Sequence, residues 1–281
     1  MPVQKQMYVI KEDGNRVPFD ESRLRRSLAH AGAKEDVQDR IVSHIGAELY
    51  DGISTRDIYR HAFALLRKEE KPLAAHYSMK RAILALGPSG FPFERFVAEI
   101  FKRKGFTTSV DVDARGMCTR HEVDVVAKKA ETCIGAELKF HNQLGTKSDI
   151  KDALYVKARF DDIILWQKKN SGNDLCINEG WFITNTSLTK HARVYGHCAG
   201  LRMISWSYPK QGSLEDLINE TGVQPVTCLT SLSGSDKMRL MEKDIVLCQN
   251  VHQDPGVLLP LGIERKKMEA AIAESKAVCG T

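Results

Sequence analysis

The chain has 281 residues, of which 42% are hydrophobic and 27% charged. This composition is typical of a soluble globular protein and excludes a largely disordered chain, and the length predicts two domains at about 150 residues each. No run reaches the roughly 18 apolar residues of a membrane span, and the N-terminus lacks the apolar stretch of a signal peptide. The net charge of +5 permits an anionic partner without requiring one.

Seven cysteines are scattered along the chain without a CxxC pair. We therefore expect neither a structural zinc site nor a disulfide scaffold, and a cytoplasmic protein with reduced thiols.

Residues 1–87 predict a small α+β domain. An apolar run at residues 8–10, turn residues at 12–15 and a second run at 17–19 form the pattern of a β-hairpin. Apolar residues then recur at helical spacing behind capping residues. The expected helices cover residues 20–31, 35–50, a stretch from about 54 and a stretch from Pro72 to Gly87. Together these elements predict a β-hairpin packed on a four-helix bundle.

A breaker cluster at residues 87–92 marks the expected boundary to a second domain at 88–223. Helix and strand patterns alternate there, which indicates an α/β domain with a central mixed sheet. Residues 224–281 predict a small helical extension for DNA binding or oligomerisation, with helices at 236–243 and 263–278. The expected strands of the second domain are 107–112, 121–127, 133–140, 163–166, 180–184 and 202–205, and its expected helices are 93–105, 148–160, 188–200 and 214–220.

The sharpest chemical signal lies on two successive strands of the second domain. The strand at 121–127 carries Asp124, and the returning strand at 133–140 carries Glu137 and Lys139. Because side chains alternate across a strand, Glu137 and Lys139 share one face, and in a hairpin Asp124 approaches Glu137. Converging carboxylates suit Mg²⁺ or Mn²⁺, and the lysine suits positioning of a water or neutralising charge on a phosphate. The plainer alternative is an exposed hairpin with an ordinary Glu–Lys ladder.

This pattern resembles the PD-(D/E)xK nuclease superfamily, and in particular Mrr-type restriction endonuclease domains and archaeal-type Holliday junction resolvases. The resemblance covers residues 88–220, although Val123 stands where the superfamily name has proline. It includes a leading helix with Glu94, whose counterpart joins the active site in those families. The resemblance implies catalytic roles for Glu94, Asp124, Glu137 and Lys139, and a metal held by Asp124 and Glu137.

Three sets of acidic or basic positions near this motif have two interpretations each. His121 is a structural histidine or a phosphate or water contact. Asp149 and Asp152 are capping or solvated residues, or further metal ligands. The cations at 102–104 balance the carboxyl end of a helix dipole or contact the DNA backbone.

The N-terminal domain resembles the ATP-cone, the regulatory nucleotide-binding module of ribonucleotide reductases and of a repressor of their genes. The match runs through residues 6–86 and includes the hairpin, the segment at 50–58 and the last helix. It departs from the cone motif at Glu12, where a basic residue is usual, so Arg16 or Arg25 would have to supply that charge. The alternative is a cone used only for dimer contacts. The implied nucleotide-binding residues are Val9, Lys11, Val17, Asp20, Arg23, Thr55, Lys80 and Arg81.

These patterns together predict a nucleotide-regulated, Mg²⁺-dependent (or Mn²⁺-dependent) DNA endonuclease with ATP or dATP as effector, acting as a homo-oligomer in restriction, repair or recombination. An alternative is a non-catalytic ATP- or dATP-responsive DNA-binding regulator that uses a nuclease fold as a platform. A third is an assembly protein with degenerate sites.

Overall fold

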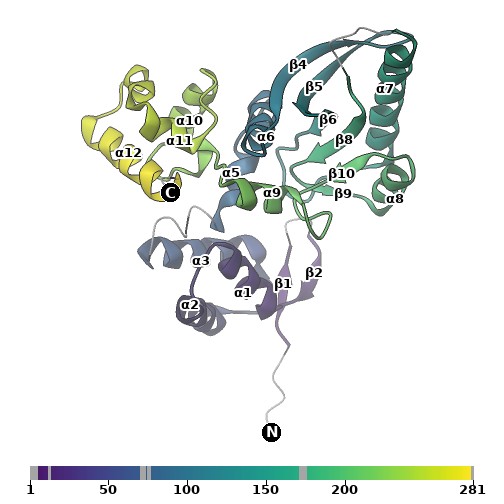
Figure 1. Cartoon of the computed structure of the whole chain (residues 1–281). Helices are drawn as coiled ribbons and strands as arrows, with labels where there is room; N and C mark the ends of the chain where they lie inside the picture. Colours follow the sequence, from purple (N-terminus) through teal and green to yellow (C-terminus); the bar gives the residue numbers. More distant parts are fainter. Residues whose placement is uncertain (1–5, 12–13, 70–73, 75–76, 171–175, 280–281) are drawn as a thin grey trace.

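The computed structural model describes residues 6–11, 14–69, 74, 77–170 and 176–279. The N-terminal domain lies on one side of a sheet domain, and the C-terminal helices pack beside the sheet domain (Figure 1). Glu12 and the expected start of the fourth N-terminal helix at Pro72 lie outside the described residues.

The N-terminal domain contains the expected hairpin. β1 (Tyr8–Ile10) and β2 (Arg16–Pro18) pair antiparallel with Val9 opposite Val17. A third strand, β3 (Ile53–Ser54), pairs parallel with β1 and was not expected from the sequence. Asp20 caps the first helix, because its carboxylate accepts the Ser22 amide at 3.0 Å. The helices are α1 (Glu21–His30), α2 (Glu35–Glu48), α3 (Thr55–Glu69) and α5 (Met79–Leu84).

The second domain is built on the expected mixed sheet, which has five strands in the order β10-β8-β6-β5-β4. β4, β5 and β6 form an antiparallel meander, and β8 and β10 run parallel to β6. Helix α6 covers one face, and α7 and α8 cover the other (Figure 1). The bounds are α6 (Phe91–Arg103), β4 (Thr107–Arg115), β5 (Arg120–Lys129), β6 (Thr132–Lys139), β7 (Lys147–Ser148), α7 (Ile150–Lys169), β8 (Glu179–Thr184), β9 (Ser187–Leu188), α8 (Lys190–Cys198), β10 (Arg202–Ile204) and α9 (Leu214–Thr221).

The expected strand at 163–166 is wrong, because these residues continue α7. Ile163 is fully buried and Leu165 is 46% exposed. The helix therefore buries one side of this apolar run and leaves the other in solvent. A four-residue apolar run is too short to distinguish a buried strand from the end of a long helix.

A pair of glycines on adjacent strands positions α7 against the sheet. Gly135 on β6 lies opposite Gly180 on β8. A Cβ atom would lie 2.6 Å from the Phe160 ring at Gly135 and 2.9 Å from it at Gly180. Phe160 therefore occupies space that exists because both residues lack a side chain. This contact fixes the distance from α7 to the strand that carries Glu137.

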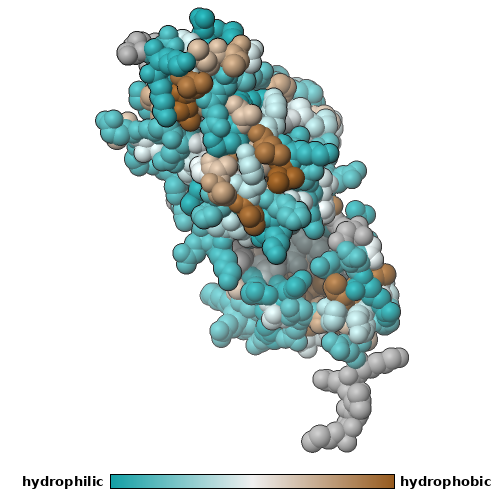
Figure 2. All heavy atoms as spheres, turned by 90° about the vertical axis from the view of Figure 1, so that its right-hand side faces the viewer, coloured by the Kyte–Doolittle hydropathy of each residue, from teal (hydrophilic) through white to brown (hydrophobic). Residues whose placement is uncertain are grey.

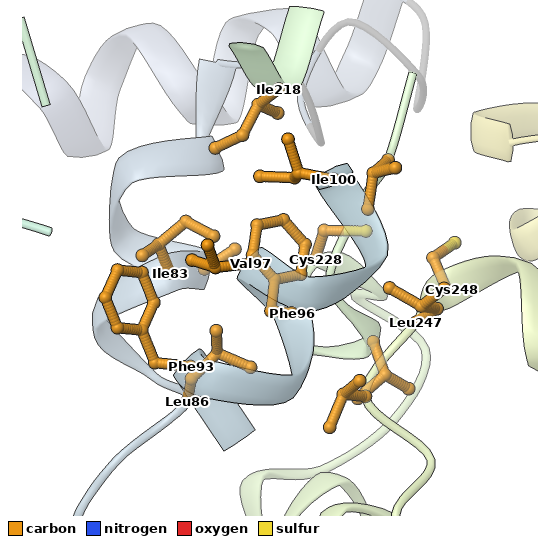
Figure 3. Packing of buried hydrophobic residues seen from close by; sticks show 14 of the residues in the cluster. Ile83, Leu86, Phe93, Phe96, Val97, Ile100, Ile218, Cys228, Leu247 and Cys248 are labelled. Atoms are coloured by element: carbon orange, nitrogen blue, oxygen red, sulfur yellow. The ribbon is translucent and has the colours of Figure 1, made fainter. Parts of the chain in front are cut away.

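The C-terminal region shares its core with the sheet domain and with the last N-terminal helix. Ile83 and Leu86, the α6 residues Phe93, Phe96, Val97 and Ile100, Ile218 of α9, and Cys228, Leu247 and Cys248 pack together (Figure 3). A separate core lies inside the N-terminal domain, formed by residues from Val9 to Ala74. The C-terminal elements are η1 (Val226–Cys228), α10 (Gly234–Met241), α11 (Cys248–Gln253), η2 (Pro255–Leu261) and α12 (Arg265–Cys279).

The face that carries α7 and α8 is mostly hydrophilic, with apolar residues in isolated groups (Figure 2). Exposed apolar side chains on these helices include Leu154, Leu165 and Val194. In the part of the chain that the structure describes, no helix combines the length and apolar character needed to cross a bilayer.

Candidate functional site

The two strands that carry the predicted catalytic residues form the expected hairpin. β5 and β6 pair antiparallel with Val125 opposite Ala136. One residue further along this register, Asp124 and Glu137 come opposite each other. The Leu138 amide donates a hydrogen bond to Asp124 Oδ2 at 2.6 Å. Asp124 and Glu137 therefore meet at the end of the β5–β6 pairing, and the hairpin brings Lys139 to the same region.

The face of the sheet to which the apolar side chains of β4 and β5 point changes at Asp124. Val110 and Val125 pack toward α6, whereas Val112 and Val123 pack toward α7. Between them Asp111, opposite Asp124 in the β4–β5 register, has a φ of 52°. Aspartate tolerates this left-handed conformation better than most residues. This change places the carboxylate of Asp111, which was not predicted from the sequence, beside Asp124.

Helix α6 brings Glu94 into the same group of carboxylates. Glu94 lies in the first turn, where its amide donates to the Gly90 carbonyl at 3.1 Å. Burial raises the pKa of Glu94 to about 8, with further contributions from Asp124 and from Asp111, whose side chain it contacts through a hydrogen bond. The predicted Glu94 therefore lies close to Asp124.

The carboxyls of Asp124 and Glu137 also have raised pKa values. Burial raises the pKa of Asp124 to about 6, although the Leu138 amide and Arg159 act against it. Burial and then Asp124 raise the pKa of Glu137 to about 8, and they outweigh the opposing effects of Arg159 and Lys139. Burial is therefore the main cause of both raised pKa values, and the neighbouring Asp124 adds to that of Glu137.

Two cations border these carboxylates. Arg159 of α7 forms an ion pair with Glu137 in which the two side chains are only 12% and 16% exposed. It also donates to the Glu122 carbonyl at 2.7 Å and lies 4.7 Å from the centre of the Tyr155 ring. Lys139 is half exposed, and its ammonium lies 3.6 Å from Asp152. Lys139 therefore stands at the rim of the site, while Arg159 reaches inside it.

Arg159 is not among the site residues predicted from the sequence. A signal was present in the spacing of Asp152, Tyr155 and Arg159 along α7, because residues three and four apart lie on one face of a helix. In the described part of the chain, no group of three or more His, Cys, Asp or Glu side chains is arranged as a metal site in this conformation.

His121, Asp149 and Asp152, which each had two interpretations, make hydrogen bonds within the protein. His121 Nε2 lies 2.8 Å from Asp162, which also accepts the Cys118 amide at 2.9 Å. Asp149 caps α7 by accepting the Lys151 amide at 2.8 Å. Asp152 completes this capping box with a bond from the Asp149 amide at 3.0 Å.

The predicted nucleotide-binding residues line two adjoining cavities. The hairpin cavity, of about 210 Å³, lies between the hairpin and α3. The junction cavity, of about 380 Å³, lies where the N-terminal domain meets the sheet domain. Lys11 and Thr55 border both cavities. The remaining predicted residues divide between the hairpin cavity (Val9, Val17, Asp20, Arg23) and the junction cavity (Lys80, Arg81).

Aromatic rings form part of the walls of both cavities. Tyr59 stacks on Tyr77 with ring centres 5.2 Å apart, and the Arg81 guanidinium lies 4.0 Å from the centre of the Tyr59 ring. Neither Arg16 nor Arg25 is among the described residues that line these cavities. Arg16 pairs with Asp51, and Arg25 pairs with Glu21 and Asp39.

Comparison with known proteins identifies both ends of the chain. Residues 7–84 match the ATP cone domain family, and residues 225–279 match the family described as AF1548-like, C-terminal. An uncharacterized protein of Archaeoglobus fulgidus is 31% identical over 185 residues, which are 66% of this chain and 100% of that protein. The chain belongs to the AF1548-like family. The match to the ATP cone family confirms the predicted N-terminal module and indicates regulation by a nucleotide.

Two solved structures resemble this AF1548-like chain. The crystal structure of the protein of unknown function AF1548 superposes with a TM-score of 0.56 and 30% identity, over 68% of this chain and 99% of that one. The MspJI restriction endonuclease in complex with a 27-mer oligonucleotide gives a TM-score of 0.32 and 14% identity, over 62% of this chain and 36% of that one. A TM-score of 0.32 supports no conclusion about fold or function.

Proposed function

We propose that this AF1548-like protein is a nucleotide-regulated, Mg²⁺-dependent DNA endonuclease of the PD-(D/E)xK type. The observation that supports this proposal is the convergence of Glu94, Asp124 and Glu137 from one helix and two strands, with Lys139 at the rim. All three carboxyls have raised pKa values, first because they are buried and, for Glu94 and Glu137, also because Asp124 lies nearby, so the group is costly to assemble. Such perturbed groups are typical of functional sites.

The donor set fits a hard divalent cation. Asp124 and Glu137 would hold Mg²⁺ or Mn²⁺, and Glu94 would join directly or through a water, because these ions prefer carboxylate oxygens. Burial is the largest cause of the raised pKa values of the three carboxyls because it disfavours their charged forms, and a bound cation would favour those forms. When bound, the ion would stabilise the negative charge that develops on the phosphate.

The remaining catalytic work falls to Lys139. Its ammonium is half exposed, and a half-exposed lysine at the rim can reach both water and a DNA phosphate. It would position the attacking water in line with the bond that breaks at phosphorus. It would also offset the charge growing on the phosphate oxygens.

Replacement of Lys139 tests this role. We expect Lys139→Ala to lower the cleavage rate about 100-fold or more, since loss of one group that stabilises the developing charge costs at least that much. Lys128→Ala is the matched control, because Lys128 lies at the opposite end of the same hairpin, opposite Cys133. The assay would use plain, methylated and branched DNAs with Mg²⁺ or Mn²⁺, with and without ATP. A folded Lys139→Ala protein that cleaves at the wild-type rate contradicts the assignment.

Metal affinity separates the nuclease from a DNA-binding regulator. We expect the wild type to bind Mn²⁺ in a calorimetric titration and Asp124→Asn to lose most of that affinity. A regulator that uses the fold only as a platform would bind DNA equally well in both proteins and would cleave none of the substrates. The predicted homo-oligomer stays a prediction, which sedimentation with and without ATP would test.

A further inference from the structure

The cavities lined by the predicted nucleotide-binding residues continue beyond the N-terminal domain to a loop of the sheet domain. Beside the junction cavity lies a larger cavity of about 800 Å³, here called the loop cleft. Its N-terminal side carries Lys11, Thr55, Arg56 and Arg81, and its other side is formed by residues 142–144. Lys11 and Thr55 border the loop cleft and the two smaller cavities alike. The three cavities therefore adjoin one another around these two residues.

The chemistry of the walls changes from one end of this series to the other. The hairpin cavity is bordered mainly by aliphatic and aromatic side chains, among them Val9, Val17 and Tyr77. The loop cleft is bordered by the cations Lys11, Arg56 and Arg81, and none of its described lining residues is acidic. A base prefers the apolar end and a polyphosphate the cationic end. A bound nucleotide is thereby oriented with its phosphates toward residues 142–144.

The loop from Phe140 to Thr146 combines a fixed base with an open tip. The His141 amide donates to Asn185 Oδ1 at 2.9 Å, and the His141 carbonyl accepts from Asn185 Nδ2 at 2.9 Å. The His141 ring lies 2.9 Å from the Ser148 hydroxyl. Asn185 and Ser148 are both fully buried. The tip residues Asn142 and Gln143 are exposed and line the cleft.

The base of this loop is joined to the proposed catalytic residues. Lys139 is the last residue of β6, three residues before Asn142. Phe140 contacts Phe93 with ring centres 5.6 Å apart, next to Glu94 in the first turn of α6. The Phe140 ring also packs so closely on Gly87 that a Cβ atom there would lie 2.8 Å from it. A displacement of the loop thus bears directly on Lys139 and on the start of α6.

We propose that the loop at 142–145 reads the terminal phosphate of a nucleoside triphosphate bound by the cone. With the base in the hairpin cavity, the triphosphate tail reaches the side-chain amides of Asn142 and Gln143, whereas a monophosphate ends short of them. The loop then distinguishes a triphosphate from a monophosphate. An effect of the bound phosphate on catalysis through Lys139 rests on the proposed nuclease function. Recognition of the phosphate by the loop does not.

Binding measurements on the full chain test the recognition step. The double variant Asn142→Ala with Gln143→Ala should lose about tenfold or more of its ATP affinity, because hydrogen bonds to a charged phosphate are stronger than neutral ones. Its AMP affinity should stay within about twofold of the wild type. Gln253→Ala, which removes an exposed amide on α11, is the matched control. Equal losses for ATP and AMP, no loss for either, or no binding of either nucleotide to the wild type would each overturn the proposal.

Hydrogen exchange provides a second readout that needs no DNA. ATP should slow amide exchange across residues 140–148, and AMP should not, because only the triphosphate holds the loop tip. A wild type that shows this protection but cleaves no DNA would end the nuclease proposal and leave the loop assignment intact. If the wild type cleaves DNA but ATP and AMP affect exchange in the loop equally, the loop assignment is wrong and the nuclease proposal stands.

Discussion

Arg159 binds the Glu137 carboxylate, which is also a proposed ligand of the metal ion. Its guanidinium pairs with that carboxylate while both side chains are almost buried, and its Nε has no hydrogen-bond partner among the described residues. A buried ion pair of this kind recovers little of the cost of removing both charges from water. We therefore interpret Arg159 as a competitor for the same carboxylate that a divalent cation would bind.

Replacement of Arg159 by methionine tests this competition. Arg159→Met should lower the free energy of unfolding of the metal-free protein by about 3–5 kcal/mol, since a buried carboxylate loses its partner. Its Mn²⁺ affinity should rise, because Glu137 no longer has to be released. Urea denaturation and calorimetry would measure both quantities. Lys157→Met, which breaks the ion pair with Asp161 on the same helix, should change stability by less than about 1 kcal/mol. Unchanged Mn²⁺ affinity in Arg159→Met would rule out competition.

The raised pKa of Glu94 makes stability depend on pH. Folded Glu94 keeps its proton to about pH 8, whereas the unfolded residue releases it near its ordinary value of 4.5. The folded state therefore binds more protons between these values, and stability falls as the pH rises through this window. Glu94→Gln should flatten that fall in melting temperature measured from pH 5 to 8. An equal fall in both proteins would show that Glu94 is not protonated in the folded state.

At the scale of elements, Phe160 and the two glycines beneath it set the position of α7. Gly135→Ala should lower the free energy of unfolding by about 1–3 kcal/mol, because its Cβ would lie 2.6 Å from the Phe160 ring. Gly46→Ala is the control, since Gly46 lies inside α2 with no atom within 4 Å of an added Cβ. That change should instead stabilise the protein by about 0.5–1 kcal/mol. Chemical denaturation measures both, and a neutral Gly135→Ala would mean that α7 can move away from the sheet without cost.

The strands that carry the site could be predicted from the sequence, but their contacts with α7 could not. Alternating apolar residues located β4, β5 and β6, and the hairpin register then brought Asp124 and Glu137 together as expected. The change of face at the paired positions Asp111 and Asp124 includes a left-handed φ at Asp111, which the side-chain pattern did not indicate. Arg159 meets Glu137 only through the packing of α7 on the sheet, so a local pattern could not pair them. The residues at 163–166 were mistaken for a strand because the run is short and apolar.

At the scale of the whole molecule, helix α5 contributes both to the junction cavity and to the core of the sheet domain. Lys80 and Arg81 of α5 line the junction cavity, whereas Ile83 of the same helix packs into the core shared by α6 and the C-terminal region (Figure 3). The η1 residue Thr227 also donates to the α5 carbonyl of Ala82 at 2.6 Å. The position of the cationic side chains in the predicted nucleotide site is thereby tied to the core of the other domain.

Truncation of Ile83 tests whether this link matters for nucleotide binding. Ile83→Ala should cost about 2–4 kcal/mol of unfolding free energy, because Ile83 is fully buried. It should also weaken ATP binding several-fold, since α5 would no longer hold Lys80 and Arg81 in place. Leu258→Ala, a fully buried position in the same core on η2, should cost a similar amount of stability and leave ATP affinity unchanged. Both proteins would be titrated well below their unfolding transitions. If the two variants bind ATP equally, the shared core stabilises α5 without positioning the nucleotide site, and the effector must reach the sheet domain through the loop at 142–145 alone.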